Sequence, residues 1–269
     1  MPYTLNDLRY LMRRLRDAET GCPWDIQQDF NSITSSTIEE AYEVVDAIEN
    51  GERSQVREEL GDLLFQIIFY SQLADEEGCF TLDDVIDGLT TKLIRRHPHV
   101  FPDGTLNSVR QEADVAVDVK AQWEAIKSQE RQDKGLTALL ADIPVRMPAL
   151  TRAYKIQKRA ASVGYDWPSL APLFDTLIDE LGELREAVAS NSSAAITDEL
   201  GDLLFTVVNI SRHLKREPES VLRGANAKFV ARINTAASLA QQKNVNLKDL
   251  SEVELDALWE QAKALLRTS

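Results

Sequence analysis

The seven-residue sequence ELGDLLF occurs twice in the chain, at residues 59–65 and at residues 199–205. In an α-helix, residues three apart share a face, so the glutamate and the aspartate of each copy point the same way. The leucines place this anionic face beside apolar surface. Because burial of carboxylates is costly and the motif contains no lysine or arginine, the sequence indicates that a cation from elsewhere neutralises them.

A glycine stands in the middle of each copy, at Gly61 and Gly201. Glycine inside a helix costs roughly 1 kcal/mol relative to alanine. We therefore expect another backbone, a side chain or a ligand to approach this position closely.

The repeat extends beyond the motif. At a constant offset of 140 residues, four acids of one half align with four acids of the other, namely Glu40, Glu43, Glu59 and Asp62 with Glu180, Glu183, Glu199 and Asp202. Further along the chain the offset becomes 136, and it aligns Lys92 with Lys228, Arg96 with Arg232 and Trp123 with Trp259. This internal duplication predicts two domains with the same order of helices.

Helical periodicity runs through most of the chain, and no segment alternates as a strand would. The sequence therefore predicts an all-α fold, with capping boxes at Thr4, Thr81 and Ser251 and the third helix as the most buried. The expected helices span about 5–19, 36–50, 54–77, 82–97, 109–127, 149–162, 172–189, 193–216, 218–241 and 252 onward.

Gly135, Pro144 and Pro148 interrupt the pattern between the two halves. We expect an N-terminal domain at 1–130, a linker at 131–148 and a C-terminal domain at 149–269.

Charge and composition narrow the classes of function. The formal net charge is −14, which argues against binding to a nucleic-acid backbone, because phosphate recognition needs a basic surface. An anionic ligand would have to be held through a metal ion. No signal-peptide layout or membrane-length apolar run is present, so we expect a soluble cytoplasmic protein. The two cysteines, Cys22 and Cys79, are expected to be reduced thiols.

The acids suggest metal chemistry. Two antiparallel helices that each offer two carboxylates would bring four of them together, and such a cluster favours a hard cation. Magnesium fits best, since it takes oxygen ligands and keeps waters for substrate phosphates; a further carboxylate can deprotonate such a water. The absence of a Glu-x-x-His pair argues against a di-iron bundle.

Each of these residues also has a purely structural interpretation. Any single glutamate at helical spacing is more often part of a solvated face, whereas the duplicated set is hard to explain that way. Lys228 and Arg232 are placed to clamp a polyphosphate, yet exposed basic residues are common. Trp259 is suited either to stacking on a base or to sealing a core.

Several segments together resemble a known family: residues 21–25, 39–43, 59–62, 95–101, 179–183 and 199–202. They are similar to the MazG nucleoside triphosphate pyrophosphohydrolases, in the two-domain form, within the all-α NTP pyrophosphatase superfamily. The resemblance implies hydrolysis of NTPs and dNTPs to the monophosphate and pyrophosphate, in clearance or regulation of nucleotide pools. It also implies Mg²⁺ as the cofactor, with Mn²⁺ as a substitute ion, and a homodimer built from helical bundles.

The resemblance assigns roles to residues of the C-terminal half. The catalytic metal ligands would be Glu180, Glu183, Glu199 and Asp202, and the nucleotide contacts would be Lys228, Arg232 and Trp259. The same acids of the N-terminal half, Glu40, Glu43, Glu59 and Asp62, would form a second site.

We predict that the C-terminal half is the main catalytic one. Asn209 follows Asp202 by seven residues on the same helix face, where the N-terminal half has Phe69. A polar amide suits nucleotide recognition and a phenyl ring suits packing. Two alternatives stay open: a dUTPase-like or modified-nucleotide pyrophosphatase, and a non-catalytic nucleotide-sensing or interaction module.

Overall fold

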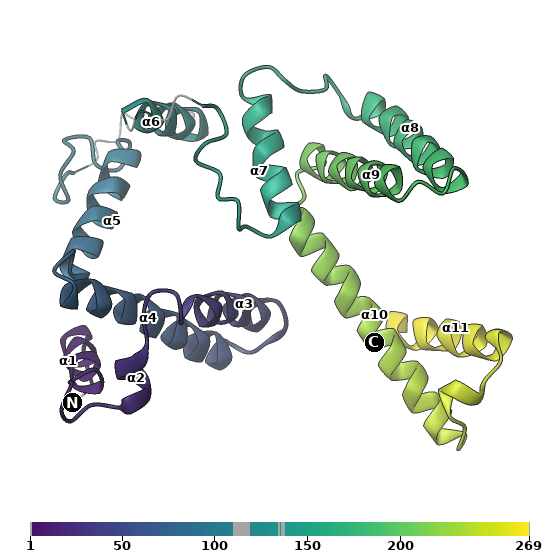
Figure 1. Cartoon of the computed structure of the whole chain (residues 1–269), viewed down its shortest axis with the longest axis horizontal. Helices are drawn as coiled ribbons and strands as arrows, with labels where there is room; N and C mark the ends of the chain where they lie inside the picture. Colours follow the sequence, from purple (N-terminus) through teal and green to yellow (C-terminus); the bar gives the residue numbers. More distant parts are fainter. Residues whose placement is uncertain (1, 110–118, 134, 136–137, 269) are drawn as a thin grey trace. The chain divides into compact units, whose positions relative to one another are not determined.

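The computed structural model describes residues 2–109, 119–133, 135 and 138–268, and these residues form helices and turns but no strand (Figure 1). The all-α prediction is confirmed. The α-helices are α1 (Leu5–Leu15), α2 (Pro23–Gln27), α3 (Thr34–Asn50), α4 (Arg53–Glu76), α5 (Leu82–Arg96), α6 (Val119–Asp133), α7 (Ala149–Ala161), α8 (Leu170–Ala189), α9 (Ser193–His213), α10 (Pro218–Gln242) and α11 (Glu252–Thr268).

The chain divides into two compact units, residues 1–129 and 130–269. The first unit contains α1 to α5, and the second contains α7 to α11. Within the described residues, none of the helices is both long enough and apolar enough to cross a membrane.

The first helix is shorter than predicted. It ends at Leu15, because the chain turns back at once: a Cβ at Gly21 would lie 2.4 Å from the carbonyl oxygen of Leu15. Pro23 then opens the short helix α2, where the sequence predicted a loop; proline is favoured at the first helical position.

Two other differences lie further along the chain. The short 3-10 helix Leu247–Asp249 was not predicted. The expected helix at 109–127 appears as α6 over Val119–Asp133, and residues 110–118 of that prediction lie outside the described residues.

The three predicted capping boxes are present. Thr4 and Thr81 each accept a hydrogen bond from the backbone of an aspartate three residues later, and that aspartate bonds back to the cap. Ser251 exchanges the same pair of hydrogen bonds with Glu254. These boxes fix where α1, α5 and α11 begin.

The core of the N-terminal unit lies around the C-terminal half of α4. Ile68, Phe69 and Leu73 of α4 pack with Met12 of α1 and Leu82 of α5. As predicted, α4 is the most buried helix of those described, and its N-terminal half is left to pair with α3.

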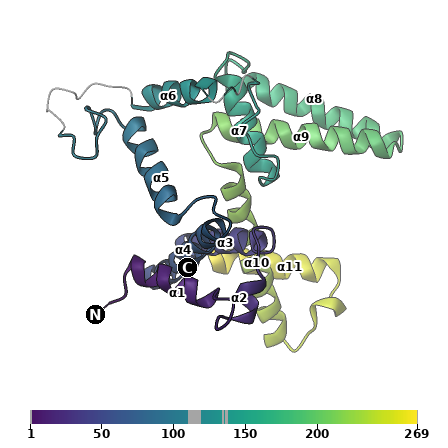
Figure 2. The ribbon, with the colours of Figure 1, turned by 60° about the vertical axis from the view of Figure 1, so that its left-hand side comes forward.

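The C-terminal unit contains a helix pair of the same kind. Helices α8 and α9 lie side by side and antiparallel in both views of the ribbon (Figures 1 and 2). Helix α7 packs on α9, and Gln157 of α7 donates a hydrogen bond of 2.8 Å to the carbonyl of Phe205. Helices α10 and α11 join through small residues, with Ala236, Ala240 and Ala262 buried around Leu258.

Met12 tests the core of the N-terminal unit. Its side chain is 0% exposed, whereas that of its neighbour Leu11 is 48% exposed. We expect Met12→Ala to lower the free energy of unfolding by about 2–5 kcal/mol, since it leaves a cavity, and the control Leu11→Ala to lower it by less than about 1 kcal/mol. Urea denaturation followed by circular dichroism measures both; equal effects would contradict this description of the core.

Candidate metal and nucleotide site

The α8–α9 hairpin is closed by a tight turn. Asn191 adopts a left-handed backbone conformation with φ of 54°, which asparagine tolerates better than most residues. Ser192 then caps α9 by accepting a hydrogen bond from the backbone N–H of Ala195. This short connection makes the two helices antiparallel neighbours, so residues at matching distances from the turn face each other.

Four carboxylates meet across this hairpin. Oxygen atoms of Glu180, Glu199 and Asp202 all lie within 4.8 Å of one another. The fourth acid, Glu183, interacts electrostatically with Glu180 and with Glu199. The structure thus brings together the four acids that the sequence singled out in this half, two from each helix.

The carboxylates of the C-terminal cluster raise one another's proton affinity. The pKa of Glu180 is raised by burial and then by the charges of Asp202, Glu183 and Asp179. The pKa of Glu199 is also raised by burial first and by Glu183 next. Without a cation, the cluster therefore favours protonation more than ordinary glutamates do.

The α3–α4 hairpin carries an equivalent cluster. Oxygen atoms of Glu40, Glu43 and Glu59 lie within 4.8 Å of one another, and Asp62 acts electrostatically on both Glu40 and Glu59. Burial, followed by the neighbouring carboxylates, raises the pKa of Glu40 and of Glu59. The second predicted set of acids is therefore also assembled.

The donor set of both clusters suits a hard divalent cation. Every candidate ligand is a carboxylate oxygen, the ligand type of magnesium, calcium and manganese. Within the described part of the chain, no lysine or arginine forms an ion pair with any of these eight acids. Neutralisation by a bound cation is the arrangement that the chemistry favours.

The central glycines do not have the close neighbours that we expected. A Cβ built at Gly61 or Gly201 meets no heavy atom within 4 Å. Nothing in the described part of the single chain therefore requires glycine at these positions, and any close approach has to come from a ligand or another chain.

The predicted nucleotide contacts form a cluster of their own on α10 and α11. The centres of the Trp259 and Phe229 rings lie 5.5 Å apart. The guanidinium carbon of Arg232 lies 5.5 Å from the centre of the Trp259 ring. Lys228 lies one turn before Arg232 on the same helix. No hydrogen bond or ion pair joins Lys228 or Arg232 to the acids of α8 and α9 among the residues described.

The N-terminal half has a weaker version of this aromatic cluster. The Lys127 ammonium lies 4.3 Å from the centre of the Trp123 ring and 3.6 Å from Glu124. At the offset of 136 residues, Leu93 takes the place of Phe229. The aromatic neighbour of the tryptophan is therefore specific to the C-terminal half.

Asn209 is 3% exposed and forms hydrogen bonds with a partly buried arginine. Its side-chain oxygen accepts hydrogen bonds of 2.9 and 2.8 Å from Arg212, which also pairs with Asp166. His213 reaches the same aspartate at 3.1 Å. The contact across 46 residues, from Arg212 to Asp166, was not indicated by the sequence. The contact of Asn209 with nucleotide stays a prediction.

The sequence analysis did not single out Gln66. It follows Asp62 by four residues and therefore lies on the same face of α4 as the acids. Its side chain is buried and opposes the rise of the pKa of Glu40. The helical spacing was the signal that could have identified it.

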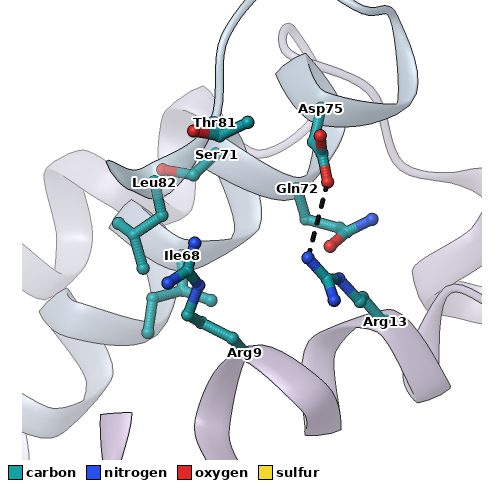
Figure 3. Close-up of a pocket in the computed structure, with 8 residues that line it drawn as sticks. All are labelled: Arg9, Arg13, Ile68, Ser71, Gln72, Asp75, Thr81 and Leu82. Carbon is teal, nitrogen blue, oxygen red and sulfur yellow. Dashed lines mark ion pairs between the residues drawn. The ribbon is translucent and has the colours of Figure 1, made fainter. Parts of the chain in front are cut away.

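A small pocket lies between α1 and the α4–α5 corner of the N-terminal unit (Figure 3). Its two arginines are already neutralised: Arg9 binds Asp83 at 2.7 Å, and Arg13 lies 3.9 Å from Asp75. We interpret this pocket as a small gap in the packing of α1 against α4 and α5, and not as a ligand site. It is lined by Arg9, Arg13, Ile68, Ser71, Gln72, Asp75, Thr81 and Leu82.

Sequence comparison agrees with the duplicated geometry. The profile of the MazG nucleotide pyrophosphohydrolase domain matches residues 28–101 and 169–236, so each acidic cluster falls within one match. The chain belongs to the MazG family.

Two relatives are similar over nearly their whole length. The chain is 42% identical to the nucleoside triphosphate pyrophosphohydrolase of Escherichia coli (strain K12), covering 96% of this chain and 97% of that protein. It is 40% identical to the nucleoside triphosphate pyrophosphohydrolase/pyrophosphatase MazG of Thermotoga maritima, covering 96% of this chain and 94% of the relative. Membership of the family therefore extends to the two-domain organisation.

The raised pKa of Glu180 predicts how stability depends on pH. Below its ordinary pKa of 4.5, the carboxyl group is protonated whether the chain is folded or unfolded. As the pH rises through the folded pKa, ionisation becomes costly in the folded state only, so the metal-free protein loses stability. In EDTA at pH 7 we expect Glu180→Gln to raise the Tm by roughly 1–3 °C and to have no such effect at pH 4.

Calorimetry at the two pH values checks this prediction. The control Asp175→Asn, on the exposed side of the same helix, should not raise the Tm at pH 7. A lower Tm for Glu180→Gln at pH 7 would contradict the proposed repulsion.

Proposed function

We propose that this chain is a magnesium-dependent nucleoside triphosphate pyrophosphohydrolase that converts NTPs and dNTPs to the monophosphate and pyrophosphate. The observation that supports it most strongly is the cluster of Glu180, Glu183, Glu199 and Asp202 on the α8–α9 hairpin of a MazG-family chain. Both relatives described above are named for this hydrolysis. The proposed role is clearance or regulation of nucleotide pools, with the cytoplasm as the place where these substrates occur.

The four carboxylates are proposed to hold the metal. A Mg²⁺ ion held by these carboxylates would supply positive charge for the triphosphate oxygens and would lower the pKa of a bound water. One of these four is proposed to act instead as the base that accepts the proton of the attacking water. The raised pKa of Glu180 and of Glu199 favours either of them for this task, because a higher pKa makes a carboxylate a stronger base. The water oxygen bonds to phosphorus as the linkage between the α and β phosphates breaks.

The cluster on α10 and α11 is proposed to bind the rest of the nucleotide. Trp259 and Phe229 offer aromatic surface for a base, and Lys228 and Arg232 supply positive charge for phosphate. Asn209 remains a candidate recognition residue of this half. The C-terminal unit is proposed as the main catalytic domain, because among the described residues the acids and this aromatic pair occur together in this unit and not in the N-terminal one.

Turnover by the C-terminal cluster can be tested by one substitution in each half. We expect Glu199→Gln to reduce Mg²⁺-dependent pyrophosphate release by on the order of 10²–10³-fold, while Glu59→Gln retains most of the activity. Product analysis with each of the eight canonical NTPs and dNTPs, scored separately for pyrophosphate and phosphate, measures this. Circular dichroism confirms that both variants are folded.

Other outcomes of this assay identify other functions. Full turnover by Glu199→Gln would overturn the assignment of the site, and loss in Glu59→Gln would make the N-terminal cluster catalytic as well. Hydrolysis confined to dUTP or to modified nucleotides would indicate a specialised pyrophosphatase. Mg²⁺-dependent binding without product would indicate a nucleotide-sensing module.

We further propose that the protein is a homodimer that binds neither nucleic acid nor membranes. Leu200, Leu204 and Val207 form an exposed apolar stripe on α9, and Leu60, Leu64 and Ile67 repeat it on α4. Contiguous apolar surface of this kind is typical of a protein interface. The open space beside Gly61 and Gly201 would let a second chain approach closely. The net charge of −14 opposes binding to polyanions.

The proposed interface makes a direct prediction about the oligomeric state. A charge at Leu204 would be buried without a partner, so we expect Leu204→Glu to raise the dimer dissociation constant by at least about 10²-fold. Sedimentation velocity at micromolar concentration would then detect monomer. The control Val253→Glu, at an exposed site on α11, should leave the dimer intact; a fully dimeric Leu204→Glu would exclude this stripe as the interface.

A further inference from the structure

Gln66 is a buried polar residue of α4 whose side-chain oxygen lacks a hydrogen-bond partner in the described part of the chain. The residue is 6% exposed. The next residues on its side of α4 are Phe69, which belongs to the apolar core, and Tyr70, which packs against that core. Buried polar groups are nearly always hydrogen-bonded, so an unpaired amide oxygen at this depth calls for an explanation.

The side chain of Gln66 is directed at the N-terminal acidic cluster. It lies on the same face of α4 as Asp62 and opposes the rise of the pKa of Glu40 that burial and the neighbouring acids cause. A neutral amide can do this only by donating from its nitrogen, which leaves its oxygen as the free acceptor. Glu40 in turn has oxygen atoms within 4.8 Å of those of Glu43 and Glu59.

We propose that Gln66 is a positioning residue of a divalent-cation site in the N-terminal unit, where its amide nitrogen orients Glu40 and its oxygen accepts a hydrogen bond from a water carried by the ion. Magnesium-like ions keep several waters when carboxylates bind them, and those waters need acceptors. Groups that orient a ligand in this way tune the affinity of a metal site. The unpaired oxygen of the metal-free chain is then explained.

The C-terminal half is built differently at this position. Thr206 stands 140 residues after Gln66, is also buried, and has a side chain too short to span the same distance. The influences on Glu180 are burial and three carboxylates. The two clusters therefore share their acids and differ in the residue that supports them, which predicts different affinities for the same ion.

Mn²⁺ binding to the full-length chain tests the role of Gln66. Glu199→Gln with Asp202→Asn removes two ligands of the C-terminal cluster, so the electron paramagnetic resonance signal of free Mn²⁺ then reports on the N-terminal one. In this background we expect Gln66→Met to weaken Mn²⁺ binding by about 10–100-fold. The same substitution should raise the Tm of the metal-free protein, because it removes an unpaired buried oxygen at nearly constant volume.

Two further variants separate this role from simple packing. The matched control Thr206→Val should leave Mn²⁺ binding in the background unchanged. Gln66→Asn keeps the amide group but shortens the side chain by one methylene, so it should also weaken Mn²⁺ binding in the background.

The proposal is overturned if the background binds no Mn²⁺ or if Gln66→Met binds it within twofold of the background. It is also overturned if Gln66→Asn binds Mn²⁺ as tightly as the background does, which decides the question should the methionine variant fail to fold. Because no nucleotide is present, these results do not depend on turnover at the C-terminal cluster.

Discussion

Repulsion between carboxylates across an antiparallel helix pair is the constraint on which the rest of the structure depends. In each half, the acid nearer the turn on one helix faces the acid nearer the turn on the other, as Glu183 faces Glu199. Like charges at this distance oppose the folded state unless they are protonated or bind a cation. The free energy that keeps the carboxylates close together therefore has to come from other contacts within the same unit. The arrangement is therefore typical of a site that is organised before its ligand arrives.

Hydrophobic packing at the other end of the same helices supplies that free energy. Helix α4 carries its acids in the N-terminal half and its buried residues, among them Ile68, Phe69 and Leu73, in the C-terminal half. Helix α4 thus contributes both to the core and to the acidic cluster. Because the helix is rigid, the packing of its C-terminal half fixes the position of the acids in its N-terminal half. The exposed apolar stripe that includes Leu60 and Leu64 belongs neither to the core nor to the acidic cluster. In the proposed homodimer, a second chain would bury it.

Local rules predicted much of this structure. The all-α fold, the capping boxes and the convergence of the acids all follow from spacings within one helix or one hairpin, and all are present. The bond from Arg212 to Asp166 was not predictable in the same way, because it joins residues 46 positions apart whose approach depends on tertiary packing. Nor did the sequence indicate that α2 would form, since the close turn at Gly21 is a property of the folded backbone.

Comparison of the two halves shows where a duplicated site is free to change. The four acids keep their identity and register in both hairpins, because each of them depends on the other three. The residues four and seven positions after the aspartate of each cluster differ between the halves. Gln66 corresponds to Thr206, and Phe69 corresponds to Asn209. All four of these side chains are buried, so each exchange required its own repacking of the surrounding core. Divergence of the halves has therefore acted on buried residues that follow the acids on the same helices, and we expect differences in affinity or activity between the sites to originate there.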